Sequence, residues 1–183
     1  MPTNCATVPV YDHRSIAVTQ TIPQSIRSAL LIVCAALLAA CQSVPTPTGF
    51  TPEQVAVLKA EGFVDQGFDW SLSMPERLLF QTNESAISAE QQAQIARIAS
   101  RLVGVGITTA RVEGHTDSVG TSAYNLTLSQ ARAVAVAEPM QAAGMQLSPD
   151  QIIGRGEAVP MSSNDTDEGR QDNRRVVVIV TPQ

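Results

Sequence analysis

The sequence predicts an α+β domain in which a mixed, four-stranded β-sheet packs against helices. Segments with the apolar pattern of strands alternate along the 183 residues with segments of helical periodicity, and this order is typical of one sheet covered by helices. The strand patterns lie at 77–80, 108–113, 151–154 and 175–180, and the longer helical patterns lie at 88–104 and 122–144. The run Val176-Val-Val-Ile-Val180 is wholly β-branched, so we expect a strand buried on both faces.

Two of the predicted helices begin at a capping box, in which the N-cap side chain and the side chain three residues later each bond to the other's backbone. Thr51-Pro-Glu-Gln54 starts a short helix, with Pro at a position that favours helix starts. Ser88-Ala-Glu-Gln91 starts a longer helix, which should end at Gly104. The long helix 122–144 contains Pro139, which we expect to kink or fray its last turns.

Residues 1–40 have the features of a secretion signal. Arg27 precedes an apolar run of roughly a dozen residues, which is shorter than the ~20 residues needed to span a bilayer. Leu38-Ala-Ala-Cys41 resembles a bacterial lipobox, which implies cleavage before Cys41 and a diacylglyceryl group on its sulfur. Gln42 in the next position implies sorting to the outer membrane. Residues 1–26 are too long and polar for the front of a signal peptide and are consistent with an over-long gene start.

After the signal peptide the chain divides into three predicted parts. Residues 41–50 contain prolines and small polar side chains, which favour an extended tether behind the lipid. Residues 51–74 form a short helix and an aromatic segment, and residues 75–183 form the main domain. The middle part contains Leu58 and the aromatic residues Phe63, Phe68 and Trp70. We expect them to cover one side of the core, and the alternative is a surface that binds a partner protein.

The composition argues against several classes of function. The chain has a net charge of −5 and stays acidic without residues 1–40, so it lacks the basic surface that binds nucleic acid. Only Cys41 of the three cysteines would remain after cleavage, which leaves no disulfide framework. No serine lies in a Gly-x-Ser-x-Gly motif, and His115 has no obvious oxyanion-stabilising donor near it. We therefore expect a protein that is not an enzyme and holds no cofactor.

Asp117 and Arg132 are the candidate binding residues. Arg132 shares a helical stripe with Leu128 and Val136, so we expect a buried guanidinium, and a buried cation that keeps its proton needs a carboxylate partner. Asp117 follows a strand pattern and lies in a loop bounded by glycines. Two interpretations remain open. The pair forms a salt bridge that joins loop to helix, or it forms a receptor for a ligand with both an ammonium and a carboxylate group.

Two metal-site interpretations are weaker. Glu113, His115 and Asp117 alternate along one strand edge, but no nearby cysteine or second histidine supplies a fourth donor. We expect His115 to be half-buried beside the loop instead. Asn164-Asp-Thr-Asp-Glu-Gly169 is similar to a calcium loop, yet Arg175 stands where that loop needs a bidentate glutamate. The sequence therefore predicts no metal site.

A set of motifs at fixed spacing resembles the OmpA C-terminal family. The matching residues, which span about 75–180, are Gly114-His-Thr-Asp117, Tyr124-Asn125, Leu128-Ser129, Arg132-Ala133, Gly154-Arg-Gly-Glu157, Pro160, Asn164, Thr166, Gly169-Arg170 and Asn173-Arg-Arg175. The resemblance implies an OmpA-like fold with two long helices on one face of the sheet. It also implies peptidoglycan as the ligand, held through the meso-diaminopimelate residue of the stem peptide.

The same resemblance implies a role for each site residue. Asp117 takes the ammonium group of the diaminopimelate, and Arg132 takes its carboxylate through a bidentate fork. The further residues implied at the site are Asn83, the backbone of Gly120, Asn125 and Arg175. Pro139 departs from the usual apolar residue of the family, which bears on the helix end and not on the site.

The upstream part of the chain adds a second hypothesis. Residues 51–63 and Leu79-Phe80 resemble the YfiB-type lipoprotein family, whose members capture a small periplasmic repressor of an inner-membrane diguanylate cyclase. The first hypothesis is an outer-membrane lipoprotein that ties the membrane to the wall by binding peptidoglycan. The alternative is a signalling lipoprotein that sequesters such a repressor and uses wall binding for positioning.

Overall fold

The structure is a computed structural model, and it describes residues 49–80 and 84–182. The predicted signal peptide, the lipidation site Cys41 and the candidate ligand contact Asn83 lie outside the described residues, as does almost all of the predicted tether. In the part of the chain that is described, no helix is long and apolar enough to cross a membrane.

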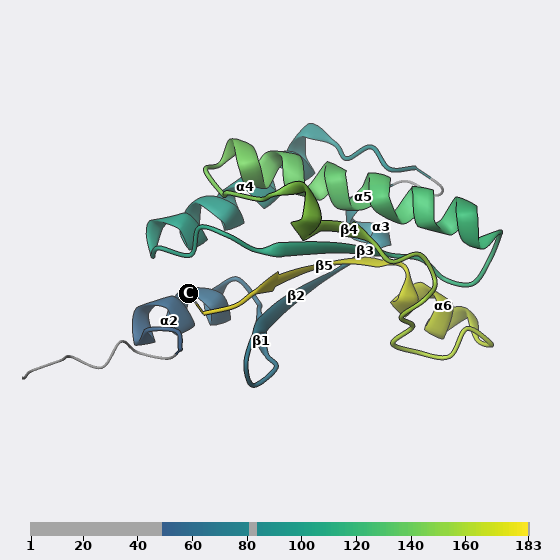
Figure 1. Cartoon of the computed structure of the whole chain (residues 1–183), viewed down its shortest axis with the longest axis horizontal. Helices are drawn as coiled ribbons and strands as arrows, with labels where there is room; N and C mark the ends of the chain where they lie inside the picture. Colours follow the sequence, from purple (N-terminus) through teal and green to yellow (C-terminus); the bar gives the residue numbers. More distant parts are fainter. Residues whose placement is uncertain (1–48, 81–83, 183) are drawn as a thin grey trace, which may run out of the picture. The chain divides into compact units, whose positions relative to one another are not determined.

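A five-stranded sheet forms the centre of the fold (Figure 1). In spatial order its strands are β1 (Val64–Asp65), β2 (Trp70–Pro75), β5 (Arg175–Val180), β3 (Arg111–His115) and β4 (Ile152–Gly154). The central strand β5 pairs antiparallel with both β2 and β3, whereas β4 pairs parallel with β3. The mixed sheet predicted from the sequence is confirmed, with one strand more than expected.

Two long helices, α4 (Ala89–Gly104) and α5 (Ser122–Ala142), cover one face of the sheet (Figure 1). The shorter helices are α2 (Pro52–Ala60), α3 (Glu76–Leu79), the 3-10 turn η1 (Pro149–Gln151) and α6 (Asp167–Asn173). The capping boxes predicted at Thr51 and Ser88 are both present. Helix α5 contains Pro139 and ends soon after it, close to the predicted end.

The predicted strand at 77–80 is wrong. The strand in this part of the sheet is β2, and residues 76–79 form the one-turn helix α3, closed by a 2.8 Å hydrogen bond from the N–H of Phe80 to the carbonyl of Glu76. A short apolar run fits a strand and a helix equally well by pattern alone. Backbone pairing with β5 selects residues 70–75 as the strand instead. Strand β3 also lies later than the predicted 108–113.

The hydrophobic core lies between the sheet and the two long helices. Val176, Val178 and Val180 of β5 are almost fully buried in the same cluster as the apolar residues of α4 and α5. The alternate residues Val177 and Ile179 are only half-buried, so β5 is central in the sheet but not buried on both faces to the same degree.

The aromatic segment divides between core and surface. Leu58, Phe63 and Trp70 belong to the core cluster, which confirms the expectation that they cover one side of the core. Phe68 behaves differently, because 75% of its surface is exposed in the turn between β1 and β2. The core interpretation is therefore wrong for Phe68 alone.

Candidate functional site

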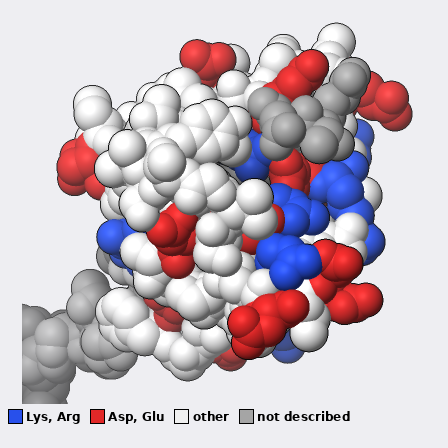
Figure 2. Space-filling model, turned by 90° about the vertical axis from the view of Figure 1, so that its right-hand side faces the viewer, with Lys and Arg blue, Asp and Glu red and all other residues white. Residues whose placement is uncertain are grey.

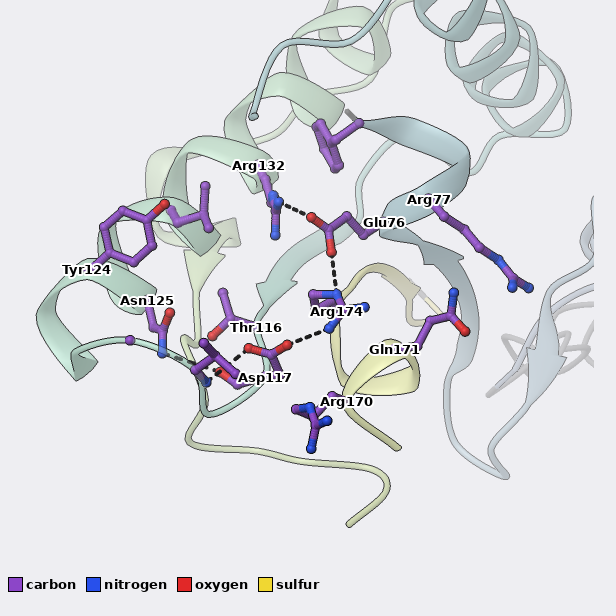
Figure 3. A pocket seen from close by; sticks show the side chains of 14 residues that line it. Glu76, Arg77, Thr116, Asp117, Tyr124, Asn125, Arg132, Arg170, Gln171 and Arg174 are labelled. Atoms are coloured by element: carbon purple, nitrogen blue, oxygen red, sulfur yellow. Dashed lines mark hydrogen bonds and ion pairs between the residues drawn. The ribbon is translucent and has the colours of Figure 1, made fainter. Parts of the chain in front are cut away.

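A cavity of about 620 Å³ lies at the end of the sheet where β3 stops and β5 begins. Its lining comes from α3, the loop after β3, helix α5 and the chain around α6, so segments far apart in the sequence meet there. Four charged side chains, Glu76, Asp117, Arg132 and Arg174, lie next to one another along it (Figure 3).

The register of β5 with its two neighbours places Glu76 and Asp117 beside Arg174. Arg175, the first residue of β5, pairs with the last residue of β2 and with the last residue of β3. The residues just beyond those strand ends therefore meet around Arg174. The N–H of Glu76 also donates to the carbonyl of Arg174 at 2.9 Å, which fixes the start of α3 at this edge.

Two glycines let α5 lie directly on the sheet and bring Arg132 to the cavity. A Cβ atom on Gly114 of β3 would lie 2.0 Å from the backbone oxygen of Ser129, and one on Gly154 of β4 would lie 2.6 Å from the backbone nitrogen of Gln130. The backbones are in contact where larger residues would separate them. Arg132 lies about one helical turn beyond this contact.

The four charged side chains form a chain of ion pairs with alternating sign (Figure 3). Nη2 of Arg132 contacts Oε1 of Glu76, whose other oxygen, Oε2, lies 2.7 Å from Nε of Arg174. Nη1 of Arg174 lies 2.5 Å from Oδ2 of Asp117. Between the described residues Asp117 and Arg132 there is no direct ion pair. Glu76, which sequence analysis did not single out, supplies the carboxylate that Arg132 requires.

The side chain of Arg132 is only 2% exposed, and three contacts hold it. Besides its ion pair, its Nε donates to the carbonyl of Glu84 at 3.2 Å, and its guanidinium lies over the ring of Phe80, 5.2 Å from the centroid. A buried guanidinium keeps its charge, so each of these contacts offsets part of the free energy lost on leaving water.

The loop after β3 presents Asp117 to the cavity. Its Oδ1 accepts a 3.0 Å hydrogen bond from the N–H of Val119, which keeps the carboxylate in place. Gly120, also in the lining, has a φ of +102°, a conformation that favours glycine. Nδ2 of Asn125 donates to the carbonyl of Asp117 at 3.3 Å. The structure thus brings Asp117, Gly120, Asn125 and Arg132 together around one cavity.

Glu157 fixes the first turn of α5 next to this loop. Its carboxylate accepts a 2.6 Å hydrogen bond from the hydroxyl of Ser122 and a second one from the amide of Asn125. These two hydrogen bonds hold the pKa of Glu157 below its ordinary value, and the bond from Ser122 has the larger effect. The charged carboxylate therefore orients Asn125 toward the loop that carries Asp117.

Arg175 does not line the cavity, although the sequence placed it among the site residues. Its guanidinium donates to the carbonyls of Asn173 and Val159, at 3.2 and 3.3 Å. The preceding residue, Arg174, lines the cavity instead, and sequence analysis missed it. Strand alternation was the available signal, because Arg174 is two residues before the core residue Val176 and therefore on the face that α5 covers.

The carboxylate of Glu113 pairs with two arginines. It forms salt bridges to Arg111 at 2.9 Å and to Arg155 at 2.7 Å. Burial raises the pKa of Glu113, but the hydrogen bonds and charges of Arg155 and Arg111 together outweigh burial, and the pKa lies below its ordinary value. Across residues 49–80 and 84–182 no group of three or more His, Cys, Asp and Glu side chains is arranged to hold a metal ion.

His115 is 2% exposed, so the expectation of a half-buried ring is wrong. Burial, followed by the positive charge of Arg175, lowers the pKa of His115 to about 4. The imidazole is therefore neutral near pH 7. Its Nε2 lies 3.6 Å from Oε2 of Glu113, and its Nδ1 has no hydrogen-bond partner among the described residues.

The surface at this end of the domain carries charges of both signs. Figure 2 faces the right-hand side of Figure 1, where α6 lies, and shows basic and acidic residues crowded together beside a broad uncharged area. A patch of mixed sign attracts a ligand that bears both charges more selectively than it attracts a polyanion.

Comparison with known proteins gives a consistent result. The OmpA family model matches residues 79–174. The putative lipoprotein YfiB of Escherichia coli strain K12 is 41% identical over 154 residues, which are 82% of this chain and 94% of that protein. The outer-membrane lipoprotein YfiB of Pseudomonas aeruginosa is 36% identical over 164 residues, which are 87% of this chain and 98% of that protein.

A solved structure extends the likeness to the fold. The cell wall anchor of the T6SS from Pseudomonas aeruginosa superposes with a TM-score of 0.56 at 28% sequence identity, covering 72% of this chain and 95% of that chain. The family model, the relatives of nearly equal length and the fold all agree. The chain therefore belongs to the OmpA family.

Proposed function

We propose that this protein is an outer-membrane lipoprotein that binds peptidoglycan without catalysis and so ties the membrane to the cell wall. The observation that carries the proposal is an acid, Asp117, and a base, Arg132, in the lining of one open cavity. The terminal carbon of meso-diaminopimelate carries both an ammonium and a carboxylate group. Asp117 takes the ammonium, and Arg132 takes the carboxylate.

The setting of these two side chains supports a binding site. The cavity of about 620 Å³ is within the size range of small-ligand sites. Gly120 lines it at a point where the backbone is open to a ligand, and Asn125 steadies the loop that carries Asp117. The solved Pseudomonas aeruginosa relative is described as a cell wall anchor, which supports the same role here.

The proposal also places a lipid on Cys41. The lipobox-like Leu38-Ala-Ala-Cys41 supports it, and both YfiB relatives are called lipoproteins. Two or more acyl chains hold a protein on a membrane durably, and the anchored domain then meets many identical stem peptides, so weak individual sites suffice. Labelling with palmitate tests the anchor: we expect label on the wild type and none on Cys41→Ser, and a labelled Cys41→Ser variant would refute it.

Sedimentation with purified sacculi tests the site. The full-length lipidated protein in detergent should sediment with sacculi, and Asp117→Asn and Arg132→Ala should each bind at least about tenfold more weakly, because each loses a charge-assisted hydrogen bond. Arg101→Ala is the control, since Arg101 also pairs with an acid, Glu61, but is 61% exposed and does not line the cavity. Unchanged retention of both site variants would overturn the assignment.

A second candidate function is favoured by Phe68, which is 75% exposed in the β1–β2 hairpin, where Val64 is 59% exposed. A pocket of about 230 Å³ lies at the same place and is lined by Phe50, Phe68 and Trp70. An exposed aromatic ring beside a pocket that combines aromatic residues with the charged Lys59 and Asp65 is typical of protein-binding surfaces. The partner in this case is a small periplasmic repressor of a diguanylate cyclase, sequestered by this hairpin while wall binding positions the protein.

Co-expression with the repressor tests this second candidate. A reading frame for a small secreted protein beside a diguanylate cyclase gene would supply the partner. We expect Phe68→Glu to abolish its co-purification and to leave sacculus binding unchanged. Met161→Glu is the matched control, because Met161 is a similarly exposed apolar residue, at 62%, outside that pocket. Equal co-purification by both variants would rule the hairpin out.

A further inference from the structure

We propose that Glu76 is an internal competitor for the carboxylate of the ligand, so that only a ligand that brings its own carboxylate to Arg132 can replace it. This inference rests on the proposed peptidoglycan site. Glu76 is not part of the motifs that carry the family resemblance, and its side chain is only 12% exposed in the cavity lining.

The guanidinium that would bind the ligand is already occupied. Nη2 of Arg132 contacts Oε1 of Glu76, and Nε of Arg132 donates to the carbonyl of Glu84 at 3.2 Å. A planar guanidinium offers a carboxylate two parallel N–H groups only when a pair of them on one edge is free. A ligand carboxylate must therefore displace Glu76 before it gains the full bidentate contact.

The Glu76–Arg174 ion pair presents a carboxylate and a cation in the same order as the ligand does. Between Arg132 and Asp117 stand first the carboxylate of Glu76 and then the guanidinium of Arg174, one facing each end (Figure 3). A diaminopimelate terminus offers a carboxylate to Arg132 and an ammonium to Asp117 in that same order. The Glu76–Arg174 pair thus stands where the zwitterion would bind.

Glu76 and Arg174 can leave the cavity together, as an intact ion pair. Oε2 of Glu76 stays paired with Nε of Arg174 at 2.7 Å if both side chains turn away together. Arg174 is 33% exposed, so this pair has a route toward water, whereas Arg132 at 2% exposure has none. Arg132 therefore remains in place and must receive a new carboxylate when Glu76 leaves.

This requirement discriminates between ligands. A stem peptide with lysine in place of diaminopimelate offers an ammonium to Asp117 but no carboxylate to Arg132. Such a ligand cannot replace Glu76, because a buried guanidinium would lose its partner. A ligand with both groups replaces the ion pair completely. Glu76 thus weakens the binding of every ligand at this site. It also makes binding by the wild type depend on the carboxylate that diaminopimelate has and lysine lacks.

Sacculus binding of the full-length lipidated protein in detergent tests the inference. Glu76→Gln keeps the shape and removes the charge, so we expect it to bind diaminopimelate-type sacculi about tenfold more tightly than the wild type, the equivalent of one charge-assisted hydrogen bond no longer displaced. Binding to lysine-type sacculi should tighten by about the same factor, because the charged Glu76 that a lysine-type ligand cannot replace is gone. Glu61→Gln is the matched control, since Glu61 is also a poorly exposed acid, at 9%, paired with an arginine away from the cavity.

The outcomes separate this inference from the proposed function. If the wild type binds sacculi, Arg132→Ala does not, and Glu76→Gln binds equally or more weakly, Glu76 only positions Arg132 and the inference is wrong. If the wild type does not bind, or Arg132→Ala binds as well, the proposed function itself fails. Thermal unfolding checks that the variants fold. Should Glu76→Gln not fold, Glu76→Asp keeps the charge with a shorter reach and should show a smaller tightening, and its absence would also overturn the inference.

Discussion

Arg174 holds Asp117 in place, with its Nη1 2.5 Å from Oδ2 of the carboxylate. The same guanidinium reaches Glu76 through Nε at 2.7 Å. Glu76 directly follows β2, and Asp117 lies two residues beyond β3, so one arginine beside the central strand joins the ends of both its neighbours. The planar guanidinium of an arginine has N–H groups on different edges, so it can pair with two carboxylates at once.

Arg174→Lys should lower the free energy of unfolding by about 1 kcal/mol, because a single ammonium cannot hold both acids in their present positions. The loss stays small, since Arg174 is one-third exposed and water screens the pairs. Urea unfolding followed by the fluorescence of the buried Trp70 measures it. Arg101→Lys, in a single exposed ion pair, should be close to neutral, and equal losses in the two variants would contradict the double role.

Gly114→Ala should destabilise the fold by roughly 3 kcal/mol or more, because the new Cβ would lie 2.0 Å from the backbone oxygen of Ser129. Neither backbone can yield without moving α5 away from β3. Gly104→Ala is the control: nothing lies within 4 Å of its new Cβ, and alanine in a helix raises stability by up to about 1 kcal/mol. Urea unfolding of both variants compares them, and similar values would argue against close packing at Gly114.

Stability should fall as the pH is lowered through the range set by His115. Its pKa is about 4 in the folded protein and about 6.5 when unfolded, so between these values the unfolded state binds more protons. The free energy of unfolding therefore decreases from about pH 6.5 toward pH 4, by at most on the order of 3 kcal/mol.

Unfolding of His115→Gln across the same pH series checks this dependence. Its stability should change less between pH 6.5 and 4.5 than that of the wild type. Glu113 contributes at lower pH, because a depressed carboxyl pKa gives stability that is present above pH 4.5 and lost as the pH falls through the folded value. A wild type and a variant with parallel curves above pH 4.5 would show that His115 does not titrate as described.

Phe63→Ala and Phe68→Ala should differ sharply, although both remove the same side chain from one short segment. Phe63 is 4% exposed in the core cluster, so its loss should lower stability by about 3–5 kcal/mol. Phe68 is 75% exposed, and its loss should change stability by less than about 0.5 kcal/mol. Chemical unfolding measures both, and a large loss for Phe68→Ala would mean that the ring packs in the fold and is not free for a partner.

The sequence by itself determined the features that depend only on residues close together in the chain. The capping boxes at Thr51 and Ser88 use hydrogen bonds between residues three positions apart, so their residue types predict them. The β-branched run 176–180 predicted a strand for the same reason, but the expected equal burial of both its faces was wrong, because Val177 and Ile179 are only half-buried. The pattern around Arg132 predicted that it would be buried and would need a carboxylate, and this held.

The tertiary structure alone decided which partners meet. Arg132 and Glu76 are 56 residues apart, and Arg174 and Asp117 are 57 apart. The register of β5 with β2 and β3 brings them together, and the pattern of one strand does not encode which strand pairs with it or in which register. For that reason the sequence predicted an acid and a base at one site, but only the folded sheet showed that Glu76 and Arg174 stand between them.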